Sequence, residues 1–364
     1  MGDLRPFHPN TPQRLRSLAP PKDRKVLAIF VLSITDRCNI ACDFCCHPYM
    51  DSEIASDDAE RLVHEAVRED FDEIGITGGE PFLKRKLLIK LATIARDAGK
   101  LFGVISNGYW AGTRQKADRL LGEFVEAGLT RLTISWDPPH GAFVPARVVQ
   151  NALDAALNLG IKVVFVGSFK NPQESHQDFG FDLTELKKYR NFTHSVGRVA
   201  PAGNAQSLND LNRTDRIDFQ TDRCLCPSRD VHELVVYAQD GLTQPCCSVY
   251  AGYKMAAMGL GDWRSMPVRD LRIRQLGDPF FTVACEGGFK RIYEIIAEKD
   301  DQLAALLPDP KTCLSTCHLC ARLMGSPIAM RIRAVLEDYL LEKVLSLQSP
   351  PQGHEAREVE QLRA

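Results

Sequence analysis

The feature that most constrains the fold is the alternation of apolar, strand-like runs with helical patterns between residues 26 and 199. Uninterrupted apolar runs, such as residues 163–166, are typical of parallel strands that are buried on both faces of a sheet. Repeated strand–helix units favour a parallel sheet covered by helices, so we predict an α/β fold with six β/α units. The predicted strands are 26–34, 72–76, 101–105, 130–135, 161–166 and 194–199, and the predicted helices are 57–69, 85–98, 114–127, 148–159 and 183–188.

The chain changes character after about residue 205, where strand alternation is confined to residues 232–239. We expect this part to be loop-rich and too poor in apolar residues for a core of its own, so that a bound metal would stabilise it. An amphipathic pattern predicts a helix at 327–347. The predicted organisation is an N-terminal arm (1–25), an α/β domain (26–205), a small cysteine-containing domain (206–325), a C-terminal helix (326–348) and a disordered tail (349–364).

The composition is that of an ordinary globular protein, with 44% hydrophobic and 25% charged residues. The formal net charge of −2 gives no electrostatic reason to expect nucleic acid or an anionic membrane as a partner. No apolar run approaches the ~18 residues that a membrane span needs, and the first residues do not resemble a secretory signal. These observations predict a cytoplasmic protein.

The twelve cysteines lie in two groups, four between residues 38 and 46 and eight between residues 224 and 320. The first group contains Cys38, Cys42 and Cys45 in the spacing C-x3-C-x2-C, directly after the first predicted strand. Three thiolates on one short loop can bind three irons of a [4Fe–4S] cluster and leave the fourth iron open to a substrate. A zinc site is the alternative, and it would need a fourth ligand such as Cys46 or His47.

Three further motifs each follow a predicted strand. They are Gly78-Gly79-Glu80-Pro81 after the second strand, Ser106-Asn107-Gly108 after the third and Ser135-Trp136-Asp137 after the fourth. Each of these motifs alone could be an ordinary turn. Because the C-terminal ends of the strands of a β/α barrel gather on one face, we expect the three motifs and the cysteine loop to form a single site.

The cysteine motif and the three strand-end motifs together resemble those of the radical S-adenosylmethionine (SAM) superfamily. The resemblance implies a partial (β/α)6 TIM-like barrel with a small, loop-rich C-terminal cluster-binding domain. It also implies that the open iron of a [4Fe–4S] cluster binds the amino and carboxylate groups of SAM. An external electron donor of the flavodoxin or ferredoxin type would reduce the cluster, which then cleaves SAM to a 5′-deoxyadenosyl radical that removes hydrogen from a substrate carbon.

The resemblance also assigns roles to individual residues. Cys38, Cys42 and Cys45 would ligate the cluster. The positions that match SAM-binding elements of the family are Phe44 near the adenine, Gly78, Gly79, Glu80 and Pro81 at the amino group, Asn107, and Ser135 and Asp137 near the carboxylate or ribose. The chain departs from the family pattern at Trp136, where a small aliphatic residue is usual, and at Pro138, where glycine is usual. His140, on the connection that follows, is either a surface residue or part of the site.

The second cysteine group is similar to the element that opens SPASM and twitch domains, because two cysteines flank Gly241 in the spacing C-x14-G-x4-C. In those domains such cysteines ligate an auxiliary [4Fe–4S] cluster. The ligands expected here are Cys226, Cys246, Cys317 and Cys320, with Cys313 as a substitute, while Cys224, Cys247 and Cys285 have no assigned role. A zinc knuckle is the alternative for this region.

The resemblance leaves the substrate open. We expect oxidation, epimerisation or crosslinking of a peptide or natural product. The alternatives are a sugar or aminocyclitol dehydrogenase or epimerase of the same superfamily, a non-enzymatic iron–sulfur electron carrier, and a zinc-binding protein. Cys46, His47 and Tyr49 lie beside the cysteine loop and are candidates for quenching a substrate radical.

Overall fold

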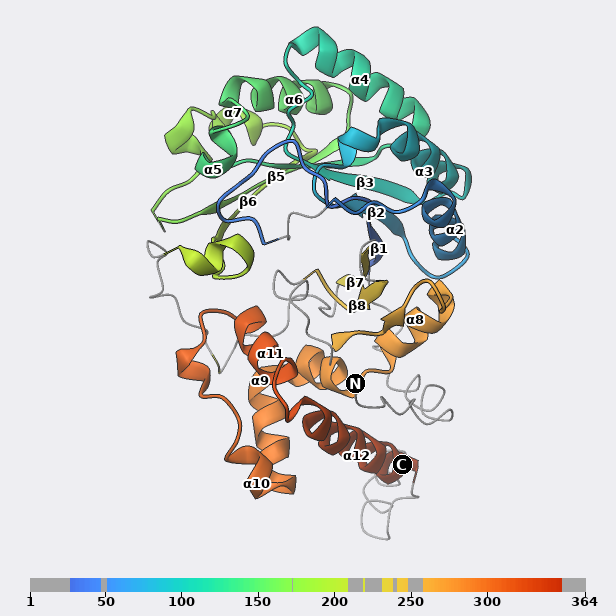
Figure 1. Ribbon diagram of the computed structural model, residues 1–364, viewed down its shortest axis with the longest axis vertical. Coiled ribbons are helices and arrows are strands. Elements are labelled where there is room, and N and C mark those ends of the chain that lie inside the picture. The colour runs from blue at the N-terminus through green and yellow to red at the C-terminus, as the bar shows by residue number, and fades with distance from the viewer. Residues whose placement is uncertain are drawn as a thin grey trace, which may run out of the picture.

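Nine strands form one sheet in the computed structural model, which describes residues 27–46, 51–171, 173–208, 219, 231–237, 241–247 and 258–348. The strand order is β6-β5-β4-β3-β2-β1-β7-β8-β9; the first seven of these are parallel to their neighbours, and β8 and β9 are antiparallel (Figure 1). The bounds are β1 Leu27–Ser33, β2 Glu73–Thr77, β3 Leu101–Ser106, β4 Arg131–Ser135, β5 Lys162–Phe169, β6 Phe192–Arg198, β7 Val231–Tyr237, β8 Leu242–Gln244 and β9 Gly261–Asp262. The predicted α/β fold with a partial, barrel-like parallel sheet is confirmed.

Helices on the outer side of this sheet follow the predicted pattern (Figure 1). The long ones are α2 (Ser56–Ala66), α3 (Arg85–Asp97), α4 (Arg114–Ala127) and α6 (Ala146–Asn158), and the short ones are η2 (Pro81–Lys84), α5 (Pro138–Gly141), η3 (His176–Phe179) and α7 (Leu183–Leu186). A further short helix, η4 (Gly203–Ser207), follows β6 and contacts the cysteine loop. In α4, for example, Ala117, Leu121 and Phe124 recur at helical spacing and are all buried. The Thr113 hydroxyl accepts a hydrogen bond from the Lys116 backbone N–H and so caps the start of this helix.

The sheet continues across the predicted boundary between residues 205 and 206. β7 pairs with β1 along its whole length, from Leu27 opposite Val231 to Ser33 opposite Tyr237. The main core likewise includes Leu234, Val236 and Trp263 from the C-terminal half of the chain. The strand that leads into the first cysteine group is therefore held between β2 on one side and a strand from the second half on the other.

The expectation that the C-terminal half lacks apolar content for a core is wrong. The structure describes α8 (Val268–Leu276), α9 (Pro279–Lys299), α10 (Asp301–Ala304), η6 (Pro310–Thr312), α11 (Thr316–Met324) and α12 (Ala329–Gln348), so residues 268–348 are mainly helical rather than loop-rich. Their buried side chains form a second cluster that includes Phe280, Phe289 and Leu336. The sequence pattern concealed α9 because Gly287 and Gly288 interrupt it, and Gly288 has a φ of 75°.

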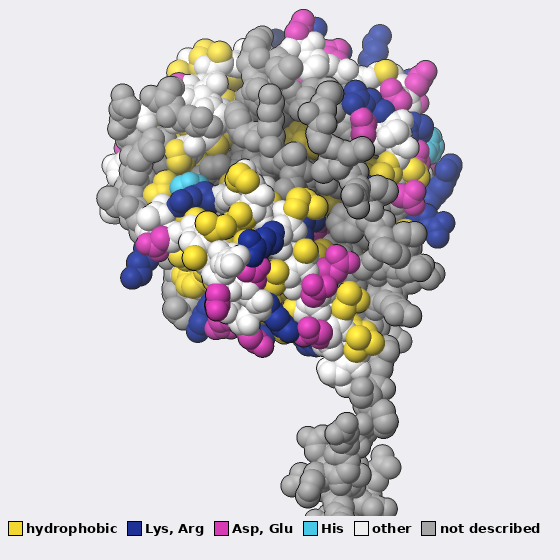
Figure 2. Space-filling model, turned by 60° about the horizontal axis from the view of Figure 1, so that its bottom comes forward, with side chains coloured by type: hydrophobic (Ala, Val, Ile, Leu, Met, Phe, Trp, Pro, Cys, Tyr) yellow, Lys and Arg dark blue, Asp and Glu magenta, His cyan; other side chains and the backbone are white. Residues whose placement is uncertain are grey.

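Charged side chains link the helices of this half. Asp278 accepts a hydrogen bond from the Phe281 backbone N–H at the start of α9 and also receives the Arg333 guanidinium from α12, and both charged groups are buried. At the surface, basic, acidic and apolar side chains are interspersed on the face shown in Figure 2. In the part of the chain that the structure describes, no helix combines the length and the apolar character needed to cross a membrane.

Candidate cofactor site

The strand-end motifs lie together at one edge of the sheet. The cysteine loop follows β1, residues 78–81 follow β2, residues 106–108 follow β3 and residues 135–137 lie at the end of β4. Since these four strands are consecutive neighbours and parallel, their C-terminal ends meet at this edge.

Two glycines allow the segment after β2 to lie directly against the segment before Cys38. The Gly79 N–H donates to the Thr35 carbonyl (2.6 Å), and the Glu80 N–H donates to the Arg37 carbonyl (2.8 Å). A Cβ atom at Gly79 would lie 2.2 Å from the Arg37 carbonyl oxygen, and one at Gly78, where φ is 148°, would lie 2.3 Å from the Thr35 carbonyl oxygen. Both positions therefore require glycine for backbone approach.

The Glu80 carboxylate joins the segments after β2 and β3. It has no exposed surface and accepts hydrogen bonds from the backbone N–H of Phe82 (3.0 Å), the Ser106 hydroxyl (2.9 Å) and the backbone N–H of Asn107 (2.8 Å). Burial raises the pKa of Glu80 to about 7, and these hydrogen bonds act in the opposite direction. These three hydrogen bonds all come from protein donors, which gives the Glu80 side chain a role in holding the two loops together.

Asn107 connects the segment after β3 to the cysteine loop. Its side-chain N–H group donates to the Asn39 side-chain oxygen (2.9 Å) and lies 3.9 Å from the Cys38 sulfur. Its side-chain oxygen accepts from the backbone N–H of Tyr109 (3.0 Å). Asn107 is almost wholly buried, so its amide fixes the position of Cys38 relative to β3.

The backbone of the cysteine loop is held from the end of the sixth β/α unit. The Cys45 N–H donates to the Cys42 carbonyl (3.3 Å), which closes a turn within the motif. Asn204, in η4, donates its backbone N–H to the Cys45 carbonyl (3.0 Å) and its side-chain N–H to the Cys42 carbonyl (3.4 Å). The segment that contains Asn204, directly after β6, therefore holds the cysteine loop against this end of the sheet.

Cys38, Cys42 and Cys45 fit the three ligands of a [4Fe–4S] cluster by residue type, by their place on one braced loop and by their burial. Burial raises the pKa of the Cys42 thiol to about 12, so iron binding must displace its proton. Among the described residues, no three His, Cys, Asp or Glu side chains are arranged to hold a single metal ion. The ligands of a cluster bind different iron atoms and do not need to converge on one point.

Asp137 is buried at the end of β4, where it is the N-cap of α5. Its carboxylate accepts hydrogen bonds from the backbone N–H groups of His140 (3.2 Å) and Ser168 (3.1 Å) and lies 2.6 Å from the His140 Nδ1. The His140 ring is 16% exposed and meets the Phe44 ring edge to face, with 5.5 Å between centroids. The structure thus brings Asp137, His140 and Phe44 together, and Ser135 lies half-buried at the end of the same strand.

A buried histidine lies beside this group, and the sequence did not reveal it. The His176 ring has no exposed surface; its Nε2 donates to the Trp136 carbonyl (2.7 Å), and its Nδ1 lies 2.8 Å from the His194 Nε2. Trp136 itself is buried, and a Cβ atom at Gly141 would lie only 2.7 Å from its ring. The departure from the family pattern at Trp136 is therefore accommodated by glycines, since a Cβ atom at Gly167 would also lie 2.4 Å from the Trp136 carbonyl oxygen.

We expect His176 to make the stability of the protein depend on pH. Burial lowers the pKa of His176 to about 4, with the nearby His194 acting in the same direction and Asp137 opposing it. The unfolded chain takes up a proton near pH 6.5 and the folded chain does not, so stability is lost as the pH falls from 6.5 toward 4. Urea unfolding at pH 7.5 and 5.5 should show that this loss is smaller in His176→Gln by about 1.4 kcal/mol.

The exposed His64→Gln is the matched control for this measurement, since His64 lies on the surface of α2. It should lose as much stability as the wild type between the two pH values. An equal loss in the wild type and in His176→Gln would contradict the assignment of a neutral, buried His176.

The C-terminal cysteines are brought together only in part within the described residues, because Cys226, like Cys224, His47 and Tyr49, lies outside them. Cys246 follows β8, Cys313 precedes α11, and Cys317 and Cys320 lie on α11. Cys246, Cys313 and Cys320 belong to one buried cluster. Burial raises the pKa of the Tyr237 hydroxyl, and Cys246, Cys247 and Cys46 act in the same direction, so the two cysteine regions approach each other around the end of β7.

Comparison with known proteins agrees with this arrangement. Residues 32–183 match the model of the Radical SAM superfamily. The chain is 27% identical over 232 residues to YydG of Bacillus subtilis (strain 168), a protein named for peptide biosynthesis, and the match covers 60% of this chain and 68% of YydG. It is 39% identical over 123 residues to a GTP 3′,8-cyclase of Synechococcus sp. (strain CC9902), with 32% of this chain and 34% of the cyclase covered.

A similar fold is found among solved structures. The structure of native anSMEcpe with bound AdoMet and Kp18Cys peptide has a TM-score of 0.52 to this chain at 14% sequence identity, and the superposition covers 86% of this chain and 100% of that one. At this level of identity the similarity concerns the fold alone. The chain spans about two thirds of YydG but only about one third of the cyclase.

Proposed function

We propose, from the premise that the chain is a radical SAM protein through residues 32–183, that it is an enzyme that cleaves SAM reductively in order to modify a peptide. The observation that supports this most directly is the convergence of four motifs at one sheet edge. The hydrogen bonds of Glu80 and Asn107 join three of them, and the ring contact between Phe44 and His140 joins the cysteine loop to the fourth. When bound, the cluster and SAM supply a 5′-deoxyadenosyl radical after the transfer of one electron. A donor of the flavodoxin or ferredoxin type would provide that electron, in the cytoplasm, where thiols stay reduced.

The residues of this chain would bind and orient the two cofactors. Cys38, Cys42 and Cys45 would ligate the cluster. The backbone carbonyl groups of residues 78–81 are proposed to accept hydrogen bonds from the amino group of SAM, on a segment that its two glycines hold against residues 35–37. Glu80 is proposed to act through this backbone by fixing it to the segment after β3.

The segment at the end of β4 would hold the rest of SAM. Phe44 is proposed to contact the adenine, and Ser135 the carboxylate or ribose. Asp137 has protein partners on both carboxylate oxygens. We therefore propose that it contributes to the binding of the SAM ribose mainly by orienting His140. Each carboxylate oxygen can accept more than one hydrogen bond, and a ribose hydroxyl would therefore be an additional donor rather than a replacement.

We further propose an auxiliary [4Fe–4S] cluster in the C-terminal half, of the SPASM or twitch kind. The proposed ligands are Cys226, Cys246, Cys317 and Cys320, with Cys313 as the substitute. The burial of Cys246, Cys313 and Cys320 in one cluster supports this grouping.

The similarity to YydG, which covers more than half of this chain, favours a peptide as the substrate over a nucleotide. Mass spectrometry of a candidate substrate peptide coexpressed with the enzyme separates oxidation and crosslinking from epimerisation. Oxidation or crosslinking removes two hydrogen atoms, whereas epimerisation in heavy water adds one deuterium. Turnover of GTP instead of the peptide would favour the small-molecule alternative.

The proposed cleavage of SAM is tested without knowledge of the substrate. The protein is reconstituted anaerobically with iron and sulfide, reduced with dithionite and supplied with SAM, and 5′-deoxyadenosine is measured by mass spectrometry. We expect slow formation of deoxyadenosine. If iron-loaded protein neither forms deoxyadenosine nor binds SAM in a calorimeter, the proposal is wrong.

A further inference from the structure

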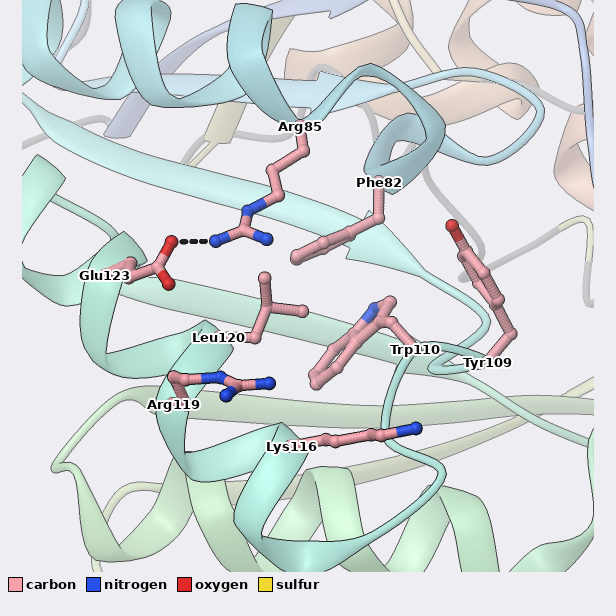
Figure 3. Close-up of a pocket in the computed structure, with 8 residues that line it drawn as sticks. All are labelled: Phe82, Arg85, Tyr109, Trp110, Lys116, Arg119, Leu120 and Glu123. Atoms are coloured by element: carbon pink, nitrogen blue, oxygen red, sulfur yellow. Dashed lines mark hydrogen bonds and ion pairs between the residues drawn. The ribbon is translucent and has the colours of Figure 1, made fainter.

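A hollow of about 270 Å³ lies on the outside of the barrel, where η2 meets the first turns of α4 (Figure 3). It is lined by Phe82, Arg85, Tyr109, Trp110, Lys116, Arg119, Leu120 and Glu123. Sites for drug-sized ligands usually enclose roughly 300–1,000 Å³. This hollow is therefore better suited to one or two side chains of a partner than to a small-molecule substrate.

The floor of the hollow is apolar and rigid. The Phe82 and Trp110 rings are stacked, with 4.9 Å between centroids and 29° between planes, and Leu120 lies beside them in Figure 3. The Trp110 indole N–H donates to the Ser106 hydroxyl (3.0 Å), which fixes the ring. An apolar floor lowers the local dielectric constant, so an ion pair formed above it is stronger than one on an open surface.

The rim of the hollow is basic. It contains Arg85, Lys116 and Arg119 but only one acidic residue, Glu123, which forms an ion pair with Arg85. The side chains of Lys116 and Arg119 are exposed, and neither forms a salt bridge within the described part of the chain. Two positive charges thus remain available to carboxylates from outside, although the whole chain has a net charge of −2.

The hollow is also close to Cys38. Tyr109, on its wall, follows Asn107 by two residues and is hydrogen-bonded to it, and the Asn107 side chain lies 3.9 Å from the Cys38 sulfur. Burial raises the pKa of the Tyr109 hydroxyl, and Glu80 and Cys38 act in the same direction, which places this ring within electrostatic reach of the cysteine. A short path of bonded and hydrogen-bonded atoms therefore joins the hollow to the cysteine loop.

We propose that this hollow is the docking site of an acidic one-electron donor protein of the flavodoxin or ferredoxin type, whose surface carboxylates pair with Lys116 and Arg119. The proposal rests on the proposed function, since only a chain that holds a reducible cluster needs such a donor. The reaction at the interface is the transfer of one electron: the donor is oxidised by one electron, the cluster is reduced by one, and no bond is made or broken. Complementary charge steers association and is weakened by salt.

The test reverses the two available charges in the double variant Lys116→Glu/Arg119→Glu. Lys162→Glu is the matched control, because Lys162 is an exposed cation at the N-terminal end of β5, whereas the hollow lies near the C-terminal ends of the strands. SAM cleavage is measured twice for each protein, once with photoreduced flavodoxin and once with dithionite, which needs no docking site. The affinity for oxidised flavodoxin is measured separately by calorimetry at low and high salt, which gives a readout that does not depend on cluster activity.

We expect the double variant to lose about tenfold or more of the flavodoxin-supported rate at low salt, with a matching loss of affinity, and to keep its dithionite-supported rate. The control should keep both rates and the affinity. An unchanged flavodoxin affinity and rate in the double variant would overturn the proposal. Equal loss of both rates would also overturn the proposal and would show that the two charges are needed for the folded protein. An effect confined to peptide turnover would overturn it as well and would show that the hollow binds the peptide substrate.

Failure of the proposed function gives a different result. In that case the wild type forms no deoxyadenosine even with dithionite, whereas the flavodoxin affinity can still be measured. Salt-sensitive binding that disappears in the double variant would then support the docking site alone, and its absence would overturn the docking site as well.

Discussion

Cys42→Ala should lower the iron content of the anaerobically reconstituted protein from about eight to about four atoms per chain and abolish 5′-deoxyadenosine formation, since each [4Fe–4S] cluster holds four irons. Cys42 is the middle cysteine of the motif and is almost wholly buried, so no nearby solvent ligand replaces it easily. Loss of the SAM-binding cluster removes the site of SAM cleavage. Iron analysis and mass spectrometry of the same sample measure both effects.

Two companion variants make this result specific. Cys320→Ala, on α11, should also lower the iron content to about four atoms per chain but should leave some deoxyadenosine formation without substrate. Cys285→Ala, on α9 and outside both proposed ligand sets, should keep about eight irons and full activity. A wild type that holds only about four irons would exclude the auxiliary cluster, and deoxyadenosine from Cys42→Ala would exclude the assigned ligand set.

Gly79→Ala is expected to damage the site as severely as the loss of a ligand, although it removes no functional group. The added methyl group would lie 2.2 Å from the Arg37 carbonyl oxygen, so the segments before Cys38 and after β2 must move apart. This breaks the hydrogen bond from the Gly79 N–H to Thr35 and displaces the start of the cysteine loop. We expect a loss of roughly 1–3 kcal/mol in unfolding free energy and of most of the iron of the first cluster.

Gly112→Ala is the control for this substitution, because a Cβ atom there meets no atom within 4 Å. It should leave stability, iron content and deoxyadenosine formation unchanged. Normal iron loading in Gly79→Ala would show that the cysteine loop does not depend on the close approach of the two segments, and the steric interpretation would be wrong.

The sheet was predictable because its strands are short and mostly apolar, and β1, β2 and β4 are buried on both faces; the predicted positions agree closely with β1 to β6. The grouping of the strand-end motifs was predictable for the same reason, since parallel strands place their C-terminal ends together. What the sequence could not give is the direction in which a side chain points. Glu80 was expected at the SAM amino group, and that role stays a prediction; what the sequence did not indicate is that its carboxylate also accepts three hydrogen bonds from the protein.

Long-range contacts account for the other gaps. No local pattern indicates that Asn204 donates hydrogen bonds to the carbonyl groups of the cysteine loop, or that the His176 ring donates one to the Trp136 carbonyl. Both contacts depend on how loops that are distant in the sequence meet. The core of the C-terminal helices was missed for a local reason, namely the glycine pair in α9. The side of the sheet on which β7 pairs is likewise decided by tertiary packing.

The pairing of β1 with β7 also sets the order in which a newly synthesised chain can finish folding. β1 leaves the ribosome first, but the strand that covers its free edge lies about 200 residues later, which corresponds to roughly 10–40 s of translation. During this time the edge that carries Ile29 and Val31 is open to association with other chains. The cysteine loop follows directly on β1, so the strand that leads into this loop is paired on both sides only after β7 has been synthesised.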